Sequence, residues 1–437
     1  MSCGLSAGNL CQEFGLKLPV SISYYPQMLS TSTTDNTLHV VFTGGGTGGH
    51  LFPGLAVAEQ IVEMVPSARI TFAGSGKPFE RRRATAAGFE YLTLPCRPLP
   101  RRPRDVFSFL KDNAAGYLAA RRFLADREVA AVVGLGGYAS VPMARCATRR
   151  GVPLVLLEQN AVSGKATRWL APRALLVCAA FEQTRARLRC RCPIRVTGTP
   201  IRRGFRRRFP AEGPPCCDRE VGVEGSAFRV QGSGLRGDAW NKHCKPRLLV
   251  LGGSGGAQSL NENVPKTLNK IRSRLEGWQI MHQSGERDFN KTRKLYRELG
   301  LQATVVDFVA DMPSVLANTD LAVCRSGGST LAELAAAGVP GVLLPYPLAT
   351  DDHQRRNAEV FTQAGGAVLL DERTSSASLA DRLAATVDEL LGDTVGRARM
   401  SAAMHRLARP NATADAAAMI MEVSGVRLED ALRHAAA

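Results

Sequence analysis

Residues 38–54 read LHVVFTGGGTGGHLFPG. A short run of β-branched and aromatic residues ends at a glycine-rich turn, and a helix-length segment begins after the turn. This is the order of strand, loop and helix that opens a βαβ unit. Glycines allow a tight turn and bring backbone amides close to a phosphate or a sugar, and the helix N-terminus adds positive potential. The stretch predicts an α/β fold with a ligand-binding loop; the alternative is a turn that serves only packing.

Similar short apolar runs alternate with helix-length segments in two series, the first beginning at Leu38 and the second at Arg247. Alternation of this kind predicts βαβ units on parallel sheets. We therefore expect two Rossmann-like, doubly wound domains that face each other across a cleft lined by loops at the carboxyl ends of the strands. The predicted units are a disordered extension (1–37), a first domain (38–203), a linker or insertion (204–246), a second domain (247–412) and a C-terminal helix (413–437).

The charge of the chain is concentrated in its first half. The formal net charge is +17, and residues 38–210 alone hold 29 Lys and Arg against 10 Asp and Glu. Such asymmetry suits an anionic partner, which could be phospholipid, pyrophosphate or nucleic acid. We do not predict nucleic acid, because no helix-turn-helix, zinc-finger or aromatic stacking pattern accompanies the charge.

The sequence also indicates where in the cell the protein is expected. No segment approaches the roughly 18 consecutive apolar residues of a membrane-spanning helix, and residues 1–37 lack the features of a secretory signal. The 11 scattered cysteines favour reduced thiols. We expect a cytoplasmic protein whose membrane contact is peripheral. A zinc site formed by Cys190, Cys192 and the cysteines and histidine of the 204–246 insertion is not favoured, because the spacings do not match structural zinc motifs.

The second domain carries its own glycine-rich loops at 252–257 and 324–338, which read GGSGGA and CRSGGSTLAELAAAG. In the longer stretch a strand end is followed by a helix N-terminus and, one turn later, by a carboxylate. A diphosphate could rest on the amides of residues 328–330 while Glu333 accepts hydrogen bonds from ribose hydroxyls. The alternative is that Glu333 is only a first-turn acid favoured by the helix dipole.

Two further patterns leave alternatives open. Residues 351–357, DDHQRRN, could hydrogen-bond sugar hydroxyls or could be a capped helix start. Gly44, Gly46 and Gly49 fit the dinucleotide fingerprint G-x-G-x-x-G, so an NAD-dependent oxidoreductase is an alternative of another class. The expected acidic residue at the end of the second strand is missing, which argues against that alternative.

Taken in order, the motifs resemble those of the MurG family: GGGTGGHLFPGLA, GLGGYASVP, EQNAVSGKATRWLA, GTPIR, LGGSGGA, HQSG, CRSGGSTLAELAAAG and DDHQRRNA. The resemblance runs from about Leu38 to the C-terminus, apart from much of the 204–246 insertion. It implies a GT-B fold in which the second domain mainly holds UDP-N-acetylglucosamine and the first receives a lipid-linked acceptor. Gly255 and His353 depart from the family pattern, so sugar contacts near them are open.

By the same resemblance, residues that match donor-contacting positions can be named one by one. They are Thr47, Gly48, Gly49, Asn160, Arg202, Ser254, Val309, Gly328, Ser329, Thr330, Leu331, Ala332, Glu333 and Gln354. Beside Val309 the backbone is expected to recognise uracil.

The implied reaction transfers N-acetylglucosamine, with inversion, to the C4 hydroxyl of N-acetylmuramic acid in undecaprenyl-pyrophosphoryl-MurNAc-pentapeptide (lipid I). The product is lipid II, a precursor of peptidoglycan. No Asp-x-Asp motif occurs, so we predict no metal and no cofactor, with helix N-termini and Arg202 meeting the charge of the departing diphosphate. Rival readings are a transferase acting on another lipid, such as diacylglycerol, and a non-catalytic binding subunit.

His50 is the candidate catalytic base, because a helix N-terminus keeps imidazole neutral and able to accept a proton. The alternative is that His50 only hydrogen-bonds a substrate. Glu158 is the reserve candidate, and its alternative is a structural carboxylate within the EQN turn.

Residues 95–111, PCRPLPRRPRDVFSFLK, combine cations with apolar side chains. Cations attract anionic headgroups and apolar residues enter the interface, so we predict contact with an anionic membrane surface. The family resemblance implies that this surface is the cytoplasmic face of the inner membrane. The alternative is a Pro-rich loop followed by an ordinary core helix. Cell-wall and division machinery is a further expected partner. The predicted membrane contacts are Arg97, Leu99, Arg101, Arg102, Arg104, Phe107, Phe109, Leu110 and Lys111.

Overall fold

The computed structural model describes residues 38–46, 48–209, 245–253, 255–373 and 377–426. The predicted extension 1–37, the predicted contacts Thr47 and Ser254, and most of the 204–246 insertion with its cysteines lie outside the described residues. Among the helices in the described ranges, none combines the length and the apolar character needed to cross a membrane.

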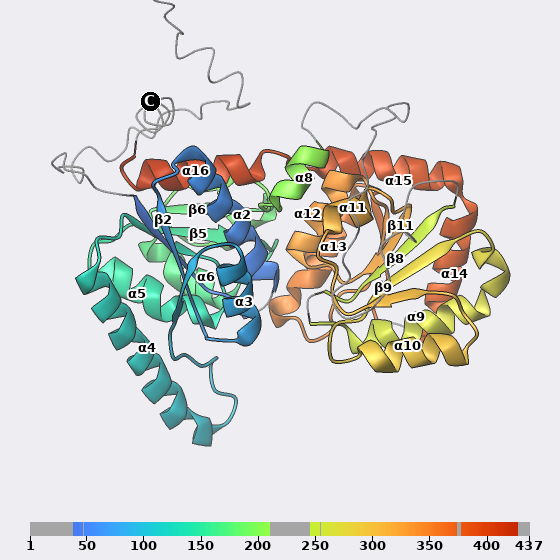
Figure 1. Cartoon of the computed structure of the whole chain (residues 1–437), viewed down its shortest axis with the longest axis horizontal. Coiled ribbons are helices and arrows are strands. Elements are labelled where there is room, and N and C mark those ends of the chain that lie inside the picture. Colours follow the sequence, from blue (N-terminus) through green and yellow to red (C-terminus); the bar gives the residue numbers. More distant parts are fainter. Residues whose placement is uncertain (1–37, 47, 210–244, 254, 374–376, 427–437) are drawn as a thin grey trace, which may run out of the picture.

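The first domain is built on a seven-stranded parallel sheet with strand order β3-β2-β1-β4-β5-β6-β7 (Figure 1). The strand order reverses between the neighbouring strands β1 and β4. The carboxyl ends of these two strands are therefore the topological switch point, where ligands bind in open α/β sheets. The strands are β1 (His39–Thr43), β2 (Arg69–Gly74), β3 (Glu90–Thr93), β4 (Ala131–Gly134), β5 (Leu154–Glu158), β6 (Leu176–Ala179) and β7 (Ile194–Val196).

The second domain repeats the design with a six-stranded parallel sheet in the order β10-β9-β8-β11-β12-β13. Its switch point lies between β8 and β11. The strands are β8 (Arg247–Leu251), β9 (Gln279–Gln283), β10 (Thr304–Val306), β11 (Leu321–Cys324), β12 (Gly341–Leu343) and β13 (Ala367–Leu369). The prediction of two doubly wound parallel sheets is confirmed.

Helices cover both faces of each sheet, which explains why the central strands are buried along their whole length and read as continuous apolar runs. In the first domain they are α2 (Gly48–Met64), α3 (Pro78–Ala86), α4 (Val106–Asp126), α5 (Val141–Arg149), α6 (Lys165–Leu170), α7 (Gln183–Arg187) and α8 (Arg203–Arg208). In the second they are α9 (Gln258–Lys270), α10 (Phe289–Glu298), α11 (Met312–Leu316), α12 (Gly328–Ala337), α13 (His353–Gln363), α14 (Leu379–Gly392) and α15 (Thr394–Leu407).

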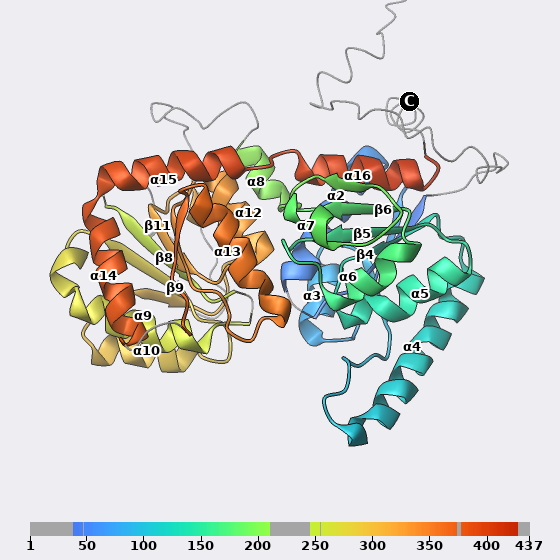
Figure 2. The ribbon, with the colours of Figure 1, turned by 180° about the vertical axis from the view of Figure 1, so that it is seen from behind.

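The C-terminal helix α16 (Ala412–Val423) returns to the first domain. Figures 1 and 2 show α15 and α16 running along one edge of the molecule, from the second domain to the first. Ala416 and Ile420 are fully buried in the same apolar cluster as Val57 and Ile61 of α2. The last helix is thus part of the first domain's core and ties the two domains together.

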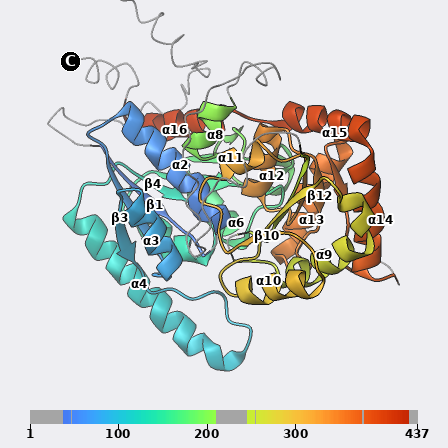
Figure 3. The ribbon, with the colours of Figure 1, turned by 45° about the vertical axis from the view of Figure 1, so that its right-hand side comes forward.

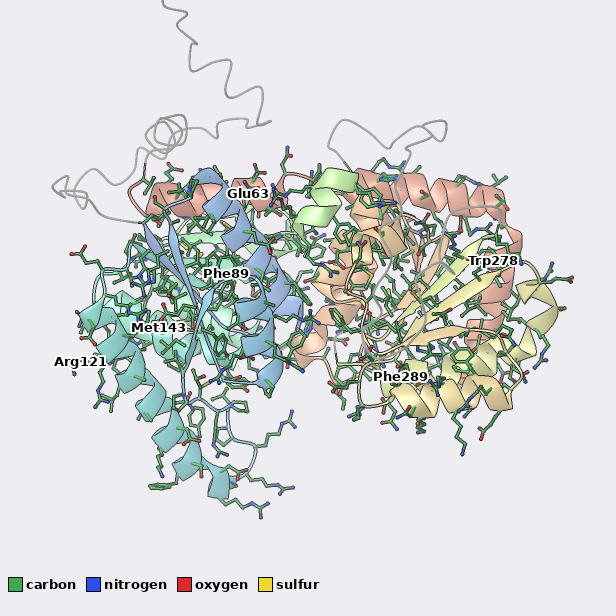
Figure 4. All side chains as sticks on the ribbon, viewed as in Figure 1. Glu63, Phe89, Arg121, Met143, Trp278 and Phe289 are labelled. Atoms are coloured by element: carbon green, nitrogen blue, oxygen red, sulfur yellow. The ribbon has the colours of Figure 1, made fainter. Side chains whose placement is uncertain are left out.

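Helix α4 divides into a packed half and a projecting half (Figure 1). Gly116, Ala120, Phe123 and Leu124 are buried, whereas none of the residues 106–115 is. In the packed half, Figure 4 shows Arg121 on the outer face of α4, and Met143 of the neighbouring helix α5 is buried inside the domain.

Candidate functional site

The first glycine-rich loop leaves β1 at the switch point of the first sheet. Gly44, Gly45 and Gly46 all have positive φ, at 135°, 141° and 94°. A Cβ on Gly44 would lie 2.7 Å from the carbonyl oxygen of Gly136. Both the backbone conformation and the close approach of the β4 loop therefore require glycine here.

Helix α12 of the second domain points its N-terminus at this loop. The Ser329 hydroxyl donates a hydrogen bond to the Gly49 carbonyl oxygen, 3.0 Å away. A Cβ on Gly328 would lie only 2.0 Å from the carbonyl oxygen of Gln159, so the two domains touch backbone to backbone. Helices α2 and α12 lie side by side across the boundary (Figure 3). The structure thus brings together the first turns of two helices that are 280 residues apart in the sequence.

The remaining predicted members of this segment occupy the first turns of α12. Ser329, Thr330 and Ala332 are partly exposed, whereas Leu331 is buried in the core of the second domain. Val309 is 2% exposed and belongs to the same apolar cluster. Any contact of Val309 with a uracil would therefore have to come from its backbone.

A second bridge between the domains joins two asparagines. The Asn357 Nδ2 donates to Asn160 Oδ1 at 3.0 Å and to the Ser326 carbonyl at 3.1 Å. The Asn357 Oδ1 accepts from the Ala161 amide at 2.8 Å. Asn357 is fully buried. Sequence reasoning did not single out Asn357, although the residue belongs to the quoted DDHQRRN stretch. Asn357 stands out only because it lies on the buried face of α13, which the sequence pattern alone does not show.

The third bridge is an ion pair. Glu333 Oε1 accepts from Arg202 Nε at 2.9 Å and lies 2.8 Å from Arg202 Nη2. Glu333 is 8% exposed. Burial raises the pKa of Glu333, and the adjacent Arg202 charge opposes that rise. The Arg202 guanidinium also lies over the ring of Phe52, 5.1 Å from its centroid.

His50 occupies the first turn of α2, next to the loop of β4. A Cβ on Gly136 would lie 3.2 Å from His50 Cδ2. Burial, followed by the charge of His353 from the second domain, lowers the pKa of His50 to about 4. His50 is therefore neutral at physiological pH, as a proton acceptor must be. The causes of the lowered pKa are burial and the facing His353, whereas the sequence led us to expect the helix N-terminus as the cause.

Glu158 lies inside the first domain. Its carboxylate accepts hydrogen bonds from the Asn160 amide at 3.1 Å, from Asn160 Nδ2 at 3.2 Å and from the Gly164 amide at 3.1 Å. Burial raises the pKa of Glu158. These contacts fix the turn that presents Asn160 to the second domain.

Gln354 opens α13 beside the loop that follows β12. Its Oε1 accepts from the Tyr346 amide at 2.9 Å, and its carbonyl accepts from the Ser326 hydroxyl at 2.8 Å. The adjacent residues Asp351 and Asp352 both have positive φ, at 53° and 56°. Arg168 of the first domain pairs with Asp351, which adds another contact across the boundary.

The predicted membrane contacts lie on the projecting half of α4 and the loop before it. Leu99, Phe107 and Leu110 are 64%, 77% and 59% exposed. Phe109 is half-buried. Arg97 pairs with Asp112. The cations that lie exposed around the apolar residues are Arg97, Arg101, Arg102, Arg104 and Lys111.

Within the described ranges, no group of three His, Cys, Asp or Glu side chains is arranged to hold a metal ion. Metal independence stays a prediction, because it concerns the reaction and needs a measurement of activity.

Both domains match known protein families. Residues 40–178 match the glycosyltransferase family 28 N-terminal domain, and residues 247–417 match the glycosyltransferase family 28 C-terminal domain. A protein of Pelobacter propionicus is 36% identical over 88% of this chain and 98% of its own length. A protein of Stutzerimonas stutzeri is 35% identical over 88% of this chain and 99% of its own length. Both are named UDP-N-acetylglucosamine–N-acetylmuramyl-(pentapeptide) pyrophosphoryl-undecaprenol N-acetylglucosamine transferase.

Solved structures agree with this match. The crystal structure of Acinetobacter baumannii MurG superposes with a TM-score of 0.63 at 27% identity, covering 88% of this chain and 99% of that one. The spinosyn forosaminyltransferase SpnP gives a TM-score of 0.60 at 14% identity, covering 89% and 100%, and shows only that the fold is shared. The predicted GT-B fold is confirmed.

Proposed function

The chain belongs to the MurG family of glycosyltransferases, and on this premise we propose that it transfers N-acetylglucosamine from UDP-N-acetylglucosamine to lipid I, giving lipid II for peptidoglycan synthesis. The support is identity of 33–36% to curated relatives that carry this activity in their names and that the chain matches over nearly their whole length. A different lipid acceptor, such as diacylglycerol, is not favoured by these matches. Residues 38–203 serve the acceptor and the membrane, and residues 247–412 serve the donor.

The observation that carries the proposal is that predicted donor contacts of the first domain, Gly49, Asn160 and Arg202, each meet a residue of the second domain at one boundary. Ser329 contacts Gly49, Asn357 contacts Asn160, and Glu333 contacts Arg202. A GT-B transferase must hold its sugar nucleotide where one domain can grip the nucleotide and the other can present the acceptor. The three bridges mark that place.

We assign the diphosphate to the N-terminus of α12, where the amides of residues 328–330 and the helix dipole favour negative charge. Arg202 supplies a full positive charge on the first-domain side. The ribose hydroxyls would donate to Glu333, whose carboxylate already accepts from Arg202. These groups meet the charge that develops on the leaving UDP without a metal ion.

The reaction is a single displacement. The C4 oxygen of N-acetylmuramic acid attacks the anomeric carbon, the bond from that carbon to the diphosphate oxygen breaks, and the configuration inverts to a β1,4 linkage. The hydroxyl proton passes to His50, which is neutral because its pKa is lowered to about 4. Glu158 is less suited, because its oxygens already accept hydrogen bonds from the turn at Asn160 and Gly164.

The projecting half of α4 is assigned to the membrane. Exposed Phe107 and Leu110 lie among cations, an arrangement that suits the interface of an anionic bilayer. The polyprenyl tail of the acceptor would remain in that bilayer while its head reaches the cleft. The proposal includes a location on the cytoplasmic face of the inner membrane and contact there with cell-wall and division machinery.

The proposal is tested by product analysis. The purified protein is incubated with UDP-N-acetylglucosamine and either polyprenyl-pyrophosphoryl-muramyl pentapeptide or diacylglycerol, with and without EDTA, and the products are identified by mass spectrometry. We expect one N-acetylhexosamine to be added to the muramyl lipid alone, at a rate that EDTA does not change. Transfer only to diacylglycerol, or thermal stabilisation by NAD rather than by UDP, would refute the assignment.

A further inference from the structure

Glu80, in the first turn of α3, is a buried carboxylate that touches the first glycine-rich loop. It is 1% exposed. Its Oε1 accepts from the Gly46 amide at 2.6 Å. Its Oε2 accepts from the Ser75 amide at 3.0 Å and from the Tyr91 hydroxyl at 2.7 Å. One side chain therefore joins the loop after β1 to the residue that follows β2 and to Tyr91 within β3.

Lys77 holds the same loop residue from the solvent side. Its Nζ donates to the Gly46 carbonyl at 3.2 Å. Both backbone polar groups of Gly46 are thus occupied by side chains from the segment that begins α3. Gly46 cannot offer its amide to a phosphate or sugar in this arrangement, so its role is to anchor the residues that follow.

The loop is shaped around the carboxylate. A Cβ on Gly45 would lie 2.9 Å from Glu80 Oε1, and a Cβ on Gly74 would lie 2.7 Å from Glu80 Oε2. The consecutive glycines at 44–46 have many accessible conformations, and fixing one of them costs conformational entropy. The two hydrogen bonds to Gly46 select one conformation before any substrate binds.

We propose that Glu80, assisted by Lys77, is a positioning residue that sets the loop leading into α2 and thereby places Gly48, Gly49 and His50 for sugar transfer. The inference rests on the proposed function and extends it to residues outside the predicted donor and membrane contacts. Misplacing a reacting group by about 1 Å can cost about 100-fold in rate, so an anchor four residues before His50 has a measurable effect.

A purely structural role makes a different prediction. If Glu80 only ties α3 to the sheet, its bonds to Ser75 and Tyr91 matter and its bond to Gly46 does not. Glu80→Gln retains one acceptor oxygen but places an amide NH₂ against either the Gly46 or the Ser75 N–H. Tyr91→Phe removes the hydroxyl that donates to Glu80 and accepts from the Gly76 amide, and it leaves the Gly46 bond intact. The two variants therefore separate the two roles.

The experiment measures steady-state transfer to the muramyl lipid by the full chain, well below the melting temperature of each variant. For Glu80→Gln we expect kcat to fall about 10- to 100-fold. Because most of the predicted nucleotide contacts lie in the second domain, we expect the stabilisation by UDP to stay close to that of the parent and the KM for UDP-N-acetylglucosamine to change less than kcat. For Tyr91→Phe we expect a lower melting temperature and a kcat close to that of the parent.

Lys77→Ala keeps the test decisive if Glu80→Gln does not fold, because Lys77 is exposed. We expect it to lower kcat without lowering the melting temperature, whereas the exposed neighbour Arg82→Ala should change neither. The inference is overturned if Glu80→Gln and Lys77→Ala both keep the kcat of the parent. If Glu80→Gln does not fold, a parental kcat in Lys77→Ala alone overturns it. Failure of the parent protein itself to make the product would instead overturn the proposed function.

Discussion

Arg202 and Glu333 form an ion pair between the two domains, with both Nε and Nη2 of the arginine within 2.9 Å of Glu333 Oε1. The carboxylate proposed to receive the ribose is thus already oriented by the cation proposed to face the diphosphate. On the proposed function, a nucleotide that binds here would extend an existing network between the domains.

Replacing Glu333 with glutamine tests the nucleotide side of this network. Hydrogen bonds to a charged group are worth about 1.5–3 kcal/mol, so we expect UDP to bind at least about 10-fold more weakly. Isothermal titration calorimetry measures the change. The exposed glutamate of α14 provides the control, Glu389→Gln, and equal UDP affinity in the two variants would count against the ribose assignment.

A double-mutant cycle tests the coupling of the pair. Arg202→Met should weaken UDP binding through the loss of charge near the diphosphate. Because the two side chains contact each other, the effects of Arg202→Met and Glu333→Gln on UDP affinity should be non-additive. Additive effects, within the error of the titrations, would mean that the pair acts as two independent contacts.

The lowered pKa of His50 predicts how both kcat/KM and stability change with pH. Since burial lowers the pKa from 6.5 to about 4, the neutral base persists down to about pH 4, and kcat/KM should fall only below that pH on account of this residue. The same shift lowers stability as the pH falls from 6.5 towards 4, because the unfolded chain then binds the proton more tightly.

Two substitutions of His50 separate its alternatives. His50→Ala should lower kcat about 10²- to 10⁴-fold if His50 is the general base. His50→Gln keeps hydrogen-bonding capacity without basicity, and a kcat near that of the parent would show that His50 only binds a substrate. Both variants should lose the part of the pH-dependent stability that His50 contributes, while His39 and His282 keep theirs, and thermal melts between pH 4 and 7 measure the difference from the parent.

Replacing Asn357 tests how much one bridge between the domains contributes to stability and to donor binding. In Asn357→Asp the amide donor is lost, so a carboxylate oxygen faces Asn160 Oδ1 and the Ser326 carbonyl. Burying unsatisfied acceptors costs about 1–3 kcal/mol. We expect a lower melting temperature and a higher KM for the donor. An unchanged KM would show that this bridge does not report on donor binding.

Membrane binding is tested by reversing charge on the projecting arm. Arg101→Glu with Arg104→Glu should abolish most flotation with anionic liposomes, since each cation near such a surface contributes about 1 kcal/mol. The control reverses Arg399 and Arg406 of α15, at the opposite edge of the molecule from the free end of α4 (Figure 2). Equal flotation of both double variants would reject the arm as the contact. Transfer to a detergent-solubilised acceptor should stay unaffected in either.

The sequence predicts the sheets well, because both are built of short apolar runs that end at glycine-rich turns. It cannot show that α16 packs on α2, since the small residues Ala416 and Ala417 fit many surfaces and only the fold decides among them. The three domain bridges join residues 131 to 280 positions apart, and no local pattern encodes such pairs.

Individual site residues show the same limit. Glu80 stands in the stretch PFERRRATA, which reads as a charged, solvated helix, yet its carboxylate is buried against the loop. Asn357 belongs to a stretch that the sequence marks as polar, but its burial depends on the face that α13 turns to the first domain. Motif resemblance identifies the segment that matters, and packing decides which side chain within it makes the contact.

The most direct test of the account is a crystal structure of the protein with UDP-N-acetylglucosamine. We predict that the diphosphate lies on the amides of residues 328–330, that the ribose hydroxyls reach Glu333, and that the sugar lies between α12 and His50. A nucleotide bound away from the boundary between the domains, or one that leaves Glu333 and the N-terminus of α12 untouched, would contradict the account.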